Sequence, residues 1–95
     1  MKVYWTNAAL QHLQAIYDYI AKDSRGYARR MIDRLTTRSR QIASSPLLGG
    51  KVPEYSADDI REVFERPYRI IYRVKGDRVD VLAVVHGARI LTPDL

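Results

Sequence analysis

Residues 60–87, IREVFERPYRIIYRVKGDRVDVLAVVHG, decide the fold of this chain. Three runs rich in Val, Ile, Tyr and Phe follow one another here, as β-strands require. The turns between them are short. One lies at Arg66-Pro67, and the other is the two-residue link Gly76-Asp77, where glycine would supply a positive φ. The stretch therefore predicts three consecutive antiparallel strands.

The middle run, Tyr68 to Val74, alternates between two kinds of side chain. Because successive residues of a strand point to opposite faces, one face of this run is apolar and the other carries arginine. The first set is Tyr68, Ile70, Tyr72 and Val74, and the second is Arg69, Ile71 and Arg73. We expect the first set to face a core.

The first half of the chain predicts a short strand and two helices. Lys2 to Thr6 is typical of a strand, and Asn7 is expected to cap the helix that follows, Ala8–Ala21. Apolar residues recur in that helix at three- and four-residue steps, which gives it one apolar face. They are Leu10, Leu13, Ile16, Tyr17 and Ile20. A second helix is expected over residues 25–43, capped by Ser24, so that the two helices form a hairpin.

Two further segments lack any periodicity. Pro46 ends the second helix. The loop runs from Ser45 to Asp59, and a loop this long is often functional or covered by a partner. The tail, Gly87–Leu95, contains apolar residues and is expected to dock on the chain or to be held by a partner.

The order of these elements predicts an α+β fold, β-α-α-β-β-β, in a single domain of residues 1–95. The economical packing places the N-terminal strand and the two-helix hairpin against a C-terminal antiparallel sheet, with both helices on one face. The other face of the sheet would then be open, and Arg69 and Arg73 would project from it or from its edge.

The net charge is +5, and its position matters more than its size. Six arginines and one acidic residue, Asp33, lie between Arg25 and Arg40, so this segment holds the whole excess. It predicts contact with an acidic partner, either nucleic acid or protein. The chain has no cysteine, which excludes disulfides and thiolate metal sites and is typical of a reducing cytoplasm. No apolar run is long enough to span a membrane.

Two groups of arginines are candidate binding residues. Arg30, Arg34 and Arg38 share one face of the second helix, where they suit phosphates or a carboxylate-rich segment unless they are simply solvated. The second group lies on neighbouring strands and would converge on one concave surface that neutralises a phosphate. Its alternative is cross-strand pairing with Glu62 or Glu65, worth under about 1 kcal/mol when exposed. This second group is Arg61, Arg69 and Arg73.

The histidines are candidates for proton transfer. His86 ends the last strand close to Arg89, where it would act as a general acid or base or serve as a structural, hydrogen-bonded residue. His12 stands alone on the first helix and is expected at the surface without a partner. Two histidines far apart without cysteine make no zinc site, so we expect neither metal nor cofactor. The acids before the first strand of the sheet, Glu54 among them, are expected to be solvated.

Four segments carry a resemblance to a known family: PLLGGKVPE (46–54), IREV (60–63), YRIIYRV (68–74) and VVHGAR (84–89). Together they resemble the RelE/ParE superfamily of bacterial toxins from type II toxin–antitoxin systems, over nearly the whole chain. The VVHGAR ending is more similar to ParE than to RelE. The resemblance implies a cognate antitoxin that wraps the toxin and silences it, in a heterodimer or a heterotetramer.

The resemblance also implies one of two activities. ParE-like members poison DNA gyrase, whereas RelE-like members enter the ribosome and cleave mRNA with basic residues on the sheet and a tyrosine or histidine near the C-terminus. Arg69 occupies the arginine of the family's Tyr-Arg strand motif, and Arg61 takes a basic position on the preceding strand. Val63 stands where RelE has a second lysine, and no tyrosine follows Tyr72, but His86 leaves the nuclease interpretation open.

We therefore predict a cytoplasmic toxin, closer to ParE, that inhibits DNA gyrase and does no chemistry of its own. We expect its antitoxin to bind at Arg30, Arg34 and Arg38. The alternatives are a metal-independent, ribosome-dependent mRNA endoribonuclease and an inactive relic that only binds its antitoxin. For the nuclease, the candidate catalytic residues are Arg61, Arg69, Arg73, His86 and Arg89.

Overall fold

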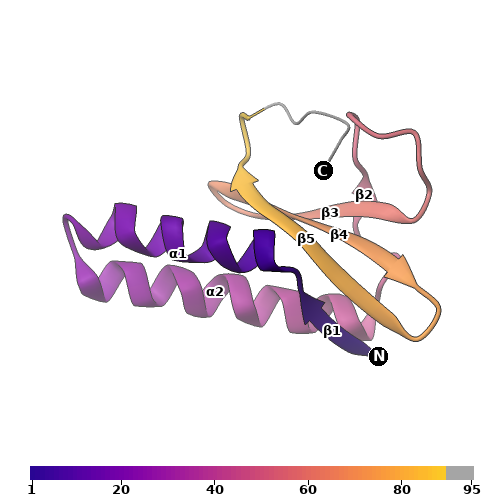
Figure 1. Cartoon of the computed structure of the whole chain (residues 1–95), viewed down its shortest axis with the longest axis horizontal. Coiled ribbons are helices and arrows are strands. Elements are labelled where there is room, and N and C mark those ends of the chain that lie inside the picture. Colours follow the sequence, from indigo (N-terminus) through magenta and orange to yellow (C-terminus); the bar gives the residue numbers. More distant parts are fainter. Residues whose placement is uncertain (90–95) are drawn as a thin grey trace.

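A computed structural model describes residues 1–89 of the chain (Figure 1). The tail prediction for residues 90–95 lies outside the described residues. The elements, in chain order, are β1 (Lys2–Trp5), α1 (Asn7–Ala21), α2 (Arg25–Ser44), β2 (Gly50–Lys51), β3 (Ile60–Glu65), β4 (Tyr68–Lys75) and β5 (Arg78–His86). The predicted α+β fold is confirmed, with the helical hairpin followed by the three long strands.

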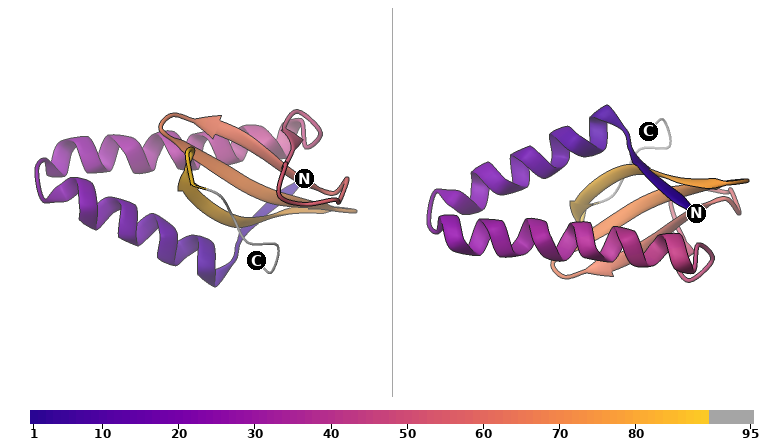
Figure 2. Two further views of the ribbon diagram at one scale, coloured as in Figure 1. Left: turned by 90° about the horizontal axis from the view of Figure 1, so that it is seen from above. Right: turned by 90° about the horizontal axis from the view of Figure 1, so that it is seen from below.

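The sheet has five strands in the order β1-β5-β4-β3-β2. The antiparallel pairing of β3 with β4 and of β4 with β5 is as predicted. The sequence did not predict that β1 pairs in parallel with β5, nor that residues 50–51, inside the expected loop, add β2 to the far edge. The two helices run side by side, and Figure 2 shows that the turn joining them projects beyond the sheet. No helix within residues 1–89 is long and apolar enough to cross a bilayer.

Two local predictions are wrong. Helix α1 begins at Asn7, and its N-cap is Thr6, whose side-chain oxygen accepts a hydrogen bond from the Ala9 amide at 3.1 Å. Thr6 also donates to the Val81 carbonyl at 2.9 Å, so the residue between β1 and α1 both binds β5 and caps the helix. The Gly76-Asp77 link does join β4 to β5, but no glycine among the described residues has a positive φ. The turn therefore uses a backbone conformation open to most residues.

The sheet has an apolar core on each face. On the helix side, Tyr68, Ile70 and Tyr72 of β4 pack against α1 and α2, as their alternation predicts. On the other face, Ile71 belongs to a second cluster. That cluster comprises Val52, Ile60, Ile71, Ala83 and Val85, with Tyr55, Ala57 and Leu82 packed against it. The expected open face is therefore wrong, because apolar residues of three strands lie there and the segment before β3 covers them.

Tyr72 of β4 holds the loop after α2 on the helix side of the sheet through two hydrogen bonds. Its side chain is fully buried, its hydroxyl donates to the Pro46 carbonyl at 2.8 Å, and it accepts from the Gly49 amide at 3.0 Å. Burial raises the pKa of the Tyr72 hydroxyl. A Cβ on Gly49 would lie 2.5 Å from both the Glu62 carbonyl oxygen and the Tyr72 hydroxyl. This backbone can approach the sheet only because residue 49 has no side chain.

Replacing Gly49 by Ala is expected to lower the free energy of unfolding by about 1–3 kcal/mol, because the loop must move and the Tyr72 hydrogen bonds lengthen. Gly50→Ala is the matched control, since nothing lies within 4 Å of its added Cβ, and it is expected to stay within about 0.5 kcal/mol of wild type. Urea unfolding of the three proteins measures both effects. Equal stabilities for the two variants would contradict this account of residue 49.

Candidate functional site

Arg69 lies in a cage of carboxylates on the sheet face away from the helices. Its side chain is 6% exposed, and those of Glu54 and Glu62 are 14% and 9% exposed. Nη2 donates to Glu54 Oε2 at 2.5 Å, and Nη1 donates to Glu62 Oε1 at 2.8 Å. Nη2 also donates to the Arg89 carbonyl at 2.6 Å. The hydrogen bond with Glu54, and then that with Glu62, raises the pKa of the Arg69 guanidinium.

This geometry corrects two expectations. Arg69 does not project into solvent, because two carboxylates neutralise it in a buried site, and the cross-strand pairing with Glu62 that was the alternative is what the structure contains. Glu54 is not solvated, because it closes the cage from the loop. Because both carboxylates already engage the guanidinium, it is not available to a phosphate.

The strand arginines do not converge. Arg61 pairs with Tyr72 across β3 and β4, and directly paired residues point to the same face, so Arg61 lies on the helix side of the sheet. There its Nη1 donates to the Gly49 carbonyl at 3.0 Å. Arg73 pairs with Ile60 and so shares the opposite face with Arg69. Its side chain is 39% exposed, and its Nε lies 3.4 Å from Asp59 Oδ2.

The arginine row on α2 is partly engaged with the sheet. Arg34 donates to Glu65 Oε2 at 2.7 Å and to the Arg66 carbonyl at 3.2 Å, yet its side chain is 48% exposed. Arg38 lies beside it in the same shallow pocket, next to Glu65. Arg30 is apart from them and stacks on Tyr27, with 5.9 Å from its guanidinium carbon to the ring centre. All three line the same edge of α2 and leave cationic surface exposed.

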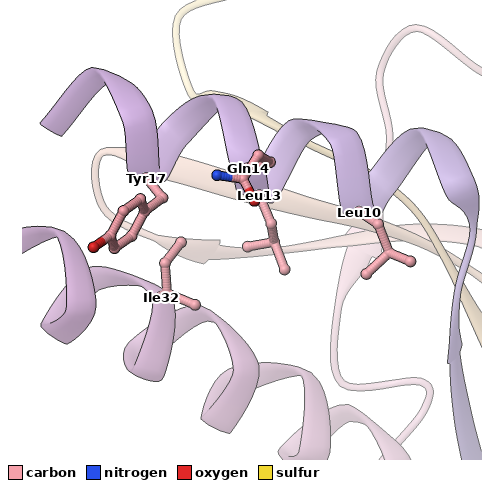
Figure 3. A pocket seen from close by; sticks show the side chains of 5 residues that line it. All are labelled: Leu10, Leu13, Gln14, Tyr17 and Ile32. Atoms are coloured by element: carbon pink, nitrogen blue, oxygen red, sulfur yellow. The ribbon is translucent and has the colours of Figure 1, made fainter. Parts of the chain in front are cut away.

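An apolar groove runs between α1 and α2 (Figure 3). Its volume is about 460 Å³, and Leu10, Leu13 and Tyr17 of α1 face Ile32 of α2 across it. Leu10 is 50% exposed, although it belongs to the apolar face that the sequence predicts for this helix. The core covers only part of the apolar stripe of α1, and the uncovered part forms one wall of this groove. A groove of this kind suits the apolar face of a helix from another chain.

His12 is not the isolated surface residue that the sequence predicted. Its Nδ1 accepts a hydrogen bond from the Val84 amide at 3.2 Å, across 72 positions of sequence. Burial, and then the charge of Arg89, lowers the pKa of the His12 imidazole. His86 ends β5, as predicted, and its side chain is exposed. Its ring meets Tyr68 edge to face, with 6.1 Å between the ring centres.

The lowered pKa of His12 makes stability depend on pH. The unfolded chain binds a proton at this residue more readily than the folded protein does, so the stability that His12 contributes is full above about pH 6.5. It is lost as the pH falls below that value towards the lower pKa of the folded state. We expect the free energy of unfolding to fall between pH 7.5 and 5.5, and to fall less in His12→Asn, which keeps an acceptor for the Val84 amide. Urea titrations at both pH values measure the difference, and equal declines in the two proteins would count against it.

The part of the chain that the structure describes contains no group of three or more His, Cys, Asp or Glu side chains arranged to hold a metal ion. Sequence reasoning missed the Glu54 contact, the partner of His12 and the groove. Of these three features, only the groove could have been predicted from the sequence, because Leu10 and Tyr17 are seven residues apart and lie on one helix stripe.

The comparisons with known proteins agree with one another. A family model described as the ParE toxin of type II toxin–antitoxin system, parDE, matches residues 3–91. Toxin RelE2 of Caulobacter vibrioides is 37% identical over 90 residues, which cover 94% of this chain and 98% of that protein. A solved structure described as the chromosomal ParDE TA system from P. aeruginosa is similar at 25% identity and a TM-score of 0.75, covering 90% of this chain and 95% of that one. A YoeB/ParE toxin from Agrobacterium tumefaciens shares the fold, with 18% identity, a TM-score of 0.64, and coverage of 90% and 98%.

Proposed function

Because the chain belongs to the ParE toxin family of type II toxin–antitoxin systems, within the RelE/ParE superfamily, we propose that it acts by binding DNA gyrase and blocking its cycle. The protein would then work in the cytoplasm, where its target is. A toxin of this kind needs a surface that fits the target and no reaction centre of its own.

The observation that carries the proposal is the carboxylate cage around Arg69. Cleavage of RNA without a metal needs a base, an acid and a cation for the phosphate within hydrogen-bonding reach of one another. Arg69, the arginine of the family's strand motif, is instead held by Glu54 and Glu62, and Arg61 lies on the other face of the sheet. These contacts favour action through binding over catalysis.

The ribosome-dependent endoribonuclease is the second candidate. It is favoured by the similarity to Toxin RelE2 and by His86, which lies near Arg89 at the end of the sheet. On this reading His86 and Arg89 would act at the RNA phosphate, whereas Arg73 pairs with Asp80 towards the other end of β4 and lies apart from them.

Expression of the chain without an antitoxin distinguishes the candidates. Gyrase inhibition predicts growth arrest with an SOS response while translation continues at first. The nuclease predicts an immediate loss of translation with cleaved mRNA and no early SOS response, abolished by His86→Gln. Normal growth at a high level of the soluble protein would identify a relic that only binds its antitoxin, and would contradict both activities.

We further propose how the antitoxin binds. The apolar face of an antitoxin helix would fill the groove between α1 and α2, and acidic residues would face the arginine row of α2. The similarity to a solved ParDE toxin–antitoxin system supports an antitoxin partner for this chain.

Reversing the charge at Arg30, Arg34 and Arg38 together is expected to weaken the antitoxin complex by about 10- to 1,000-fold at low salt, because exposed ion pairs across an interface are lost and like charges replace them. The change in stability is expected to stay near 1 kcal/mol, since Arg34–Glu65 is an exposed pair. Titration calorimetry with purified antitoxin at low and high salt measures the affinity.

The chain offers a matched control in Arg25, Arg29 and Arg40, which are exposed arginines on another row of the same helix. Their reversal to Glu changes the net charge equally, and it is expected to weaken binding far less. If both triple variants lost the same affinity, net charge alone would explain the effect and the row would have no special role.

A further inference from the structure

A pocket of about 330 Å³ lies between α1 and the ends of β4 and β5, away from the groove and the arginine row. Its polar lining comes from His12 and Tyr19 of α1, Tyr68 of β4, His86 of β5, and Arg89. Its remaining lining is apolar. No carboxylate lines it.

Both histidines offer the pocket a hydrogen-bond donor. His12 Nδ1 accepts from the Val84 amide at 3.2 Å, and His86 Nδ1 accepts from the Ala88 amide at 3.3 Å. A neutral imidazole that accepts at Nδ1 carries its proton on Nε2. Each ring therefore presents an N–H at its free nitrogen, and neither presents the lone pair that a metal ion or a general base requires there.

Arg89 adds a fixed positive charge. Its carbonyl accepts from Arg69 at 2.6 Å, its amide donates to the His86 carbonyl at 3.0 Å, and Gly87 beside it donates to the Pro67 carbonyl at 2.7 Å. These bonds hold the backbone and leave the side chain exposed. Among the ion pairs of residues 1–89, none involves Arg89.

The lining thus combines a guanidinium and two N–H donors with aromatic rings and an apolar floor, and it contains no negative charge. Donors from α1, from β5 and from the segment after it suit a tetrahedral oxyanion, which accepts hydrogen bonds on several sides. The pocket is larger than a lone oxyanion needs, and the Tyr19 ring, 71% exposed, lies at its rim. We propose that this pocket binds a small phosphate monoester that carries an aromatic ring, with the phosphate at Arg89, His12 and His86 and the ring against Tyr19.

The proposal is independent of the gyrase target, but it uses His86 and Arg89, the residues of the nuclease candidate. A ligand titration followed by NMR tests it without ribosomes, so its outcome is separate from that of the mRNA cleavage assay. Adenosine 5′-monophosphate and phenyl phosphate are titrated separately into the full chain at constant ionic strength, with inorganic phosphate, adenosine and phenol as comparisons. We expect one or both esters to shift the ring signals of His12 and His86, because the bound phosphate accepts hydrogen bonds from both rings. Tighter binding of the nucleotide would identify a nucleotide site, and tighter binding of phenyl phosphate a simple aryl phosphate site.

Arg89→Gln is expected to weaken binding of the ester at least about tenfold, since it removes a charge-assisted contact, whereas Arg29→Gln on the exposed face of α2 should change nothing. Arg89→Gln keeps the backbone carbonyl that Arg69 contacts, so the fold should be preserved, and its amide spectrum checks this. The proposal is overturned if neither ester shifts the histidine signals at 10 mM, a concentration that detects binding free energies as small as about 3 kcal/mol. It is also overturned if adenosine or phenol binds as well as its ester, or if Arg89→Gln binds like wild type.

Discussion

Replacing Arg69 by Met is expected to lower the free energy of unfolding by about 3–5 kcal/mol, a large part of the stability of a domain this size. The guanidinium is almost fully buried, and its removal takes away the cation that the carboxylates of Glu54 and Glu62 share. It also removes the bond to the Arg89 carbonyl, which connects the cage to the segment after β5. The midpoint temperature of thermal unfolding should fall by roughly 4–8 °C for each kcal/mol of stability lost.

Two further variants isolate the cause. Arg73→Met removes an arginine from the same face of the same strand, but this side chain is 39% exposed and makes one long ion pair, so we expect a loss below about 1 kcal/mol. Adding Glu54→Gln and Glu62→Gln to Arg69→Met should recover part of the loss, because no uncompensated charge then remains. If the free energy of unfolding of Arg69→Met were within about 1 kcal/mol of the wild-type value, the cage would not stabilise the fold as its contacts imply.

Replacing Leu10 by Asp is expected to weaken the antitoxin complex on the order of 100-fold, while the toxin stays folded and active. Leu10 lies at the edge of the groove between α1 and α2 and is half exposed, so an acid is tolerated there in the free toxin. In the complex, the same acid would be buried against the apolar face of the antitoxin helix. Cells that express both proteins should then no longer be protected.

Leu47→Asp is the matched control, since Leu47 is 66% exposed and lies outside the groove. We expect antitoxin to neutralise this variant as it does wild type. Binding measured by calorimetry, with thermal unfolding as a check on folding, separates a lost contact from a lost fold. Full neutralisation of Leu10→Asp would place the antitoxin somewhere other than the groove.

The sequence predicted those parts of the fold that depend on short-range patterns. The alternation of Tyr68, Ile70 and Tyr72 correctly gave the helix-facing side of β4, and the two-residue link correctly gave the β4–β5 hairpin. Ser24 does cap α2, accepting from the Tyr27 amide at 3.1 Å. The family resemblance was confirmed as well, because it rests on segments distributed along the whole chain.

The predictions that were wrong depend on contacts between distant residues. Alternation placed Arg69 on the correct face, but its burial depends on Glu54, fifteen positions earlier in a segment without periodicity. His12 finds its partner 72 positions away, and Lys2 pairs with Arg78 in a parallel register that no local pattern specifies. Leu10 belongs to the predicted apolar stripe and is nonetheless half exposed, because a helical stripe shows which residues share a face, and not how much of that face the core covers.

The measurement that tests the central claim most directly is a supercoiling assay with purified DNA gyrase, run beside a ribosome-dependent mRNA cleavage assay on the same toxin preparation. We predict that the toxin inhibits supercoiling, that purified antitoxin reverses the inhibition, and that mRNA on ribosomes stays intact. Unimpaired gyrase together with cleaved mRNA would contradict the account.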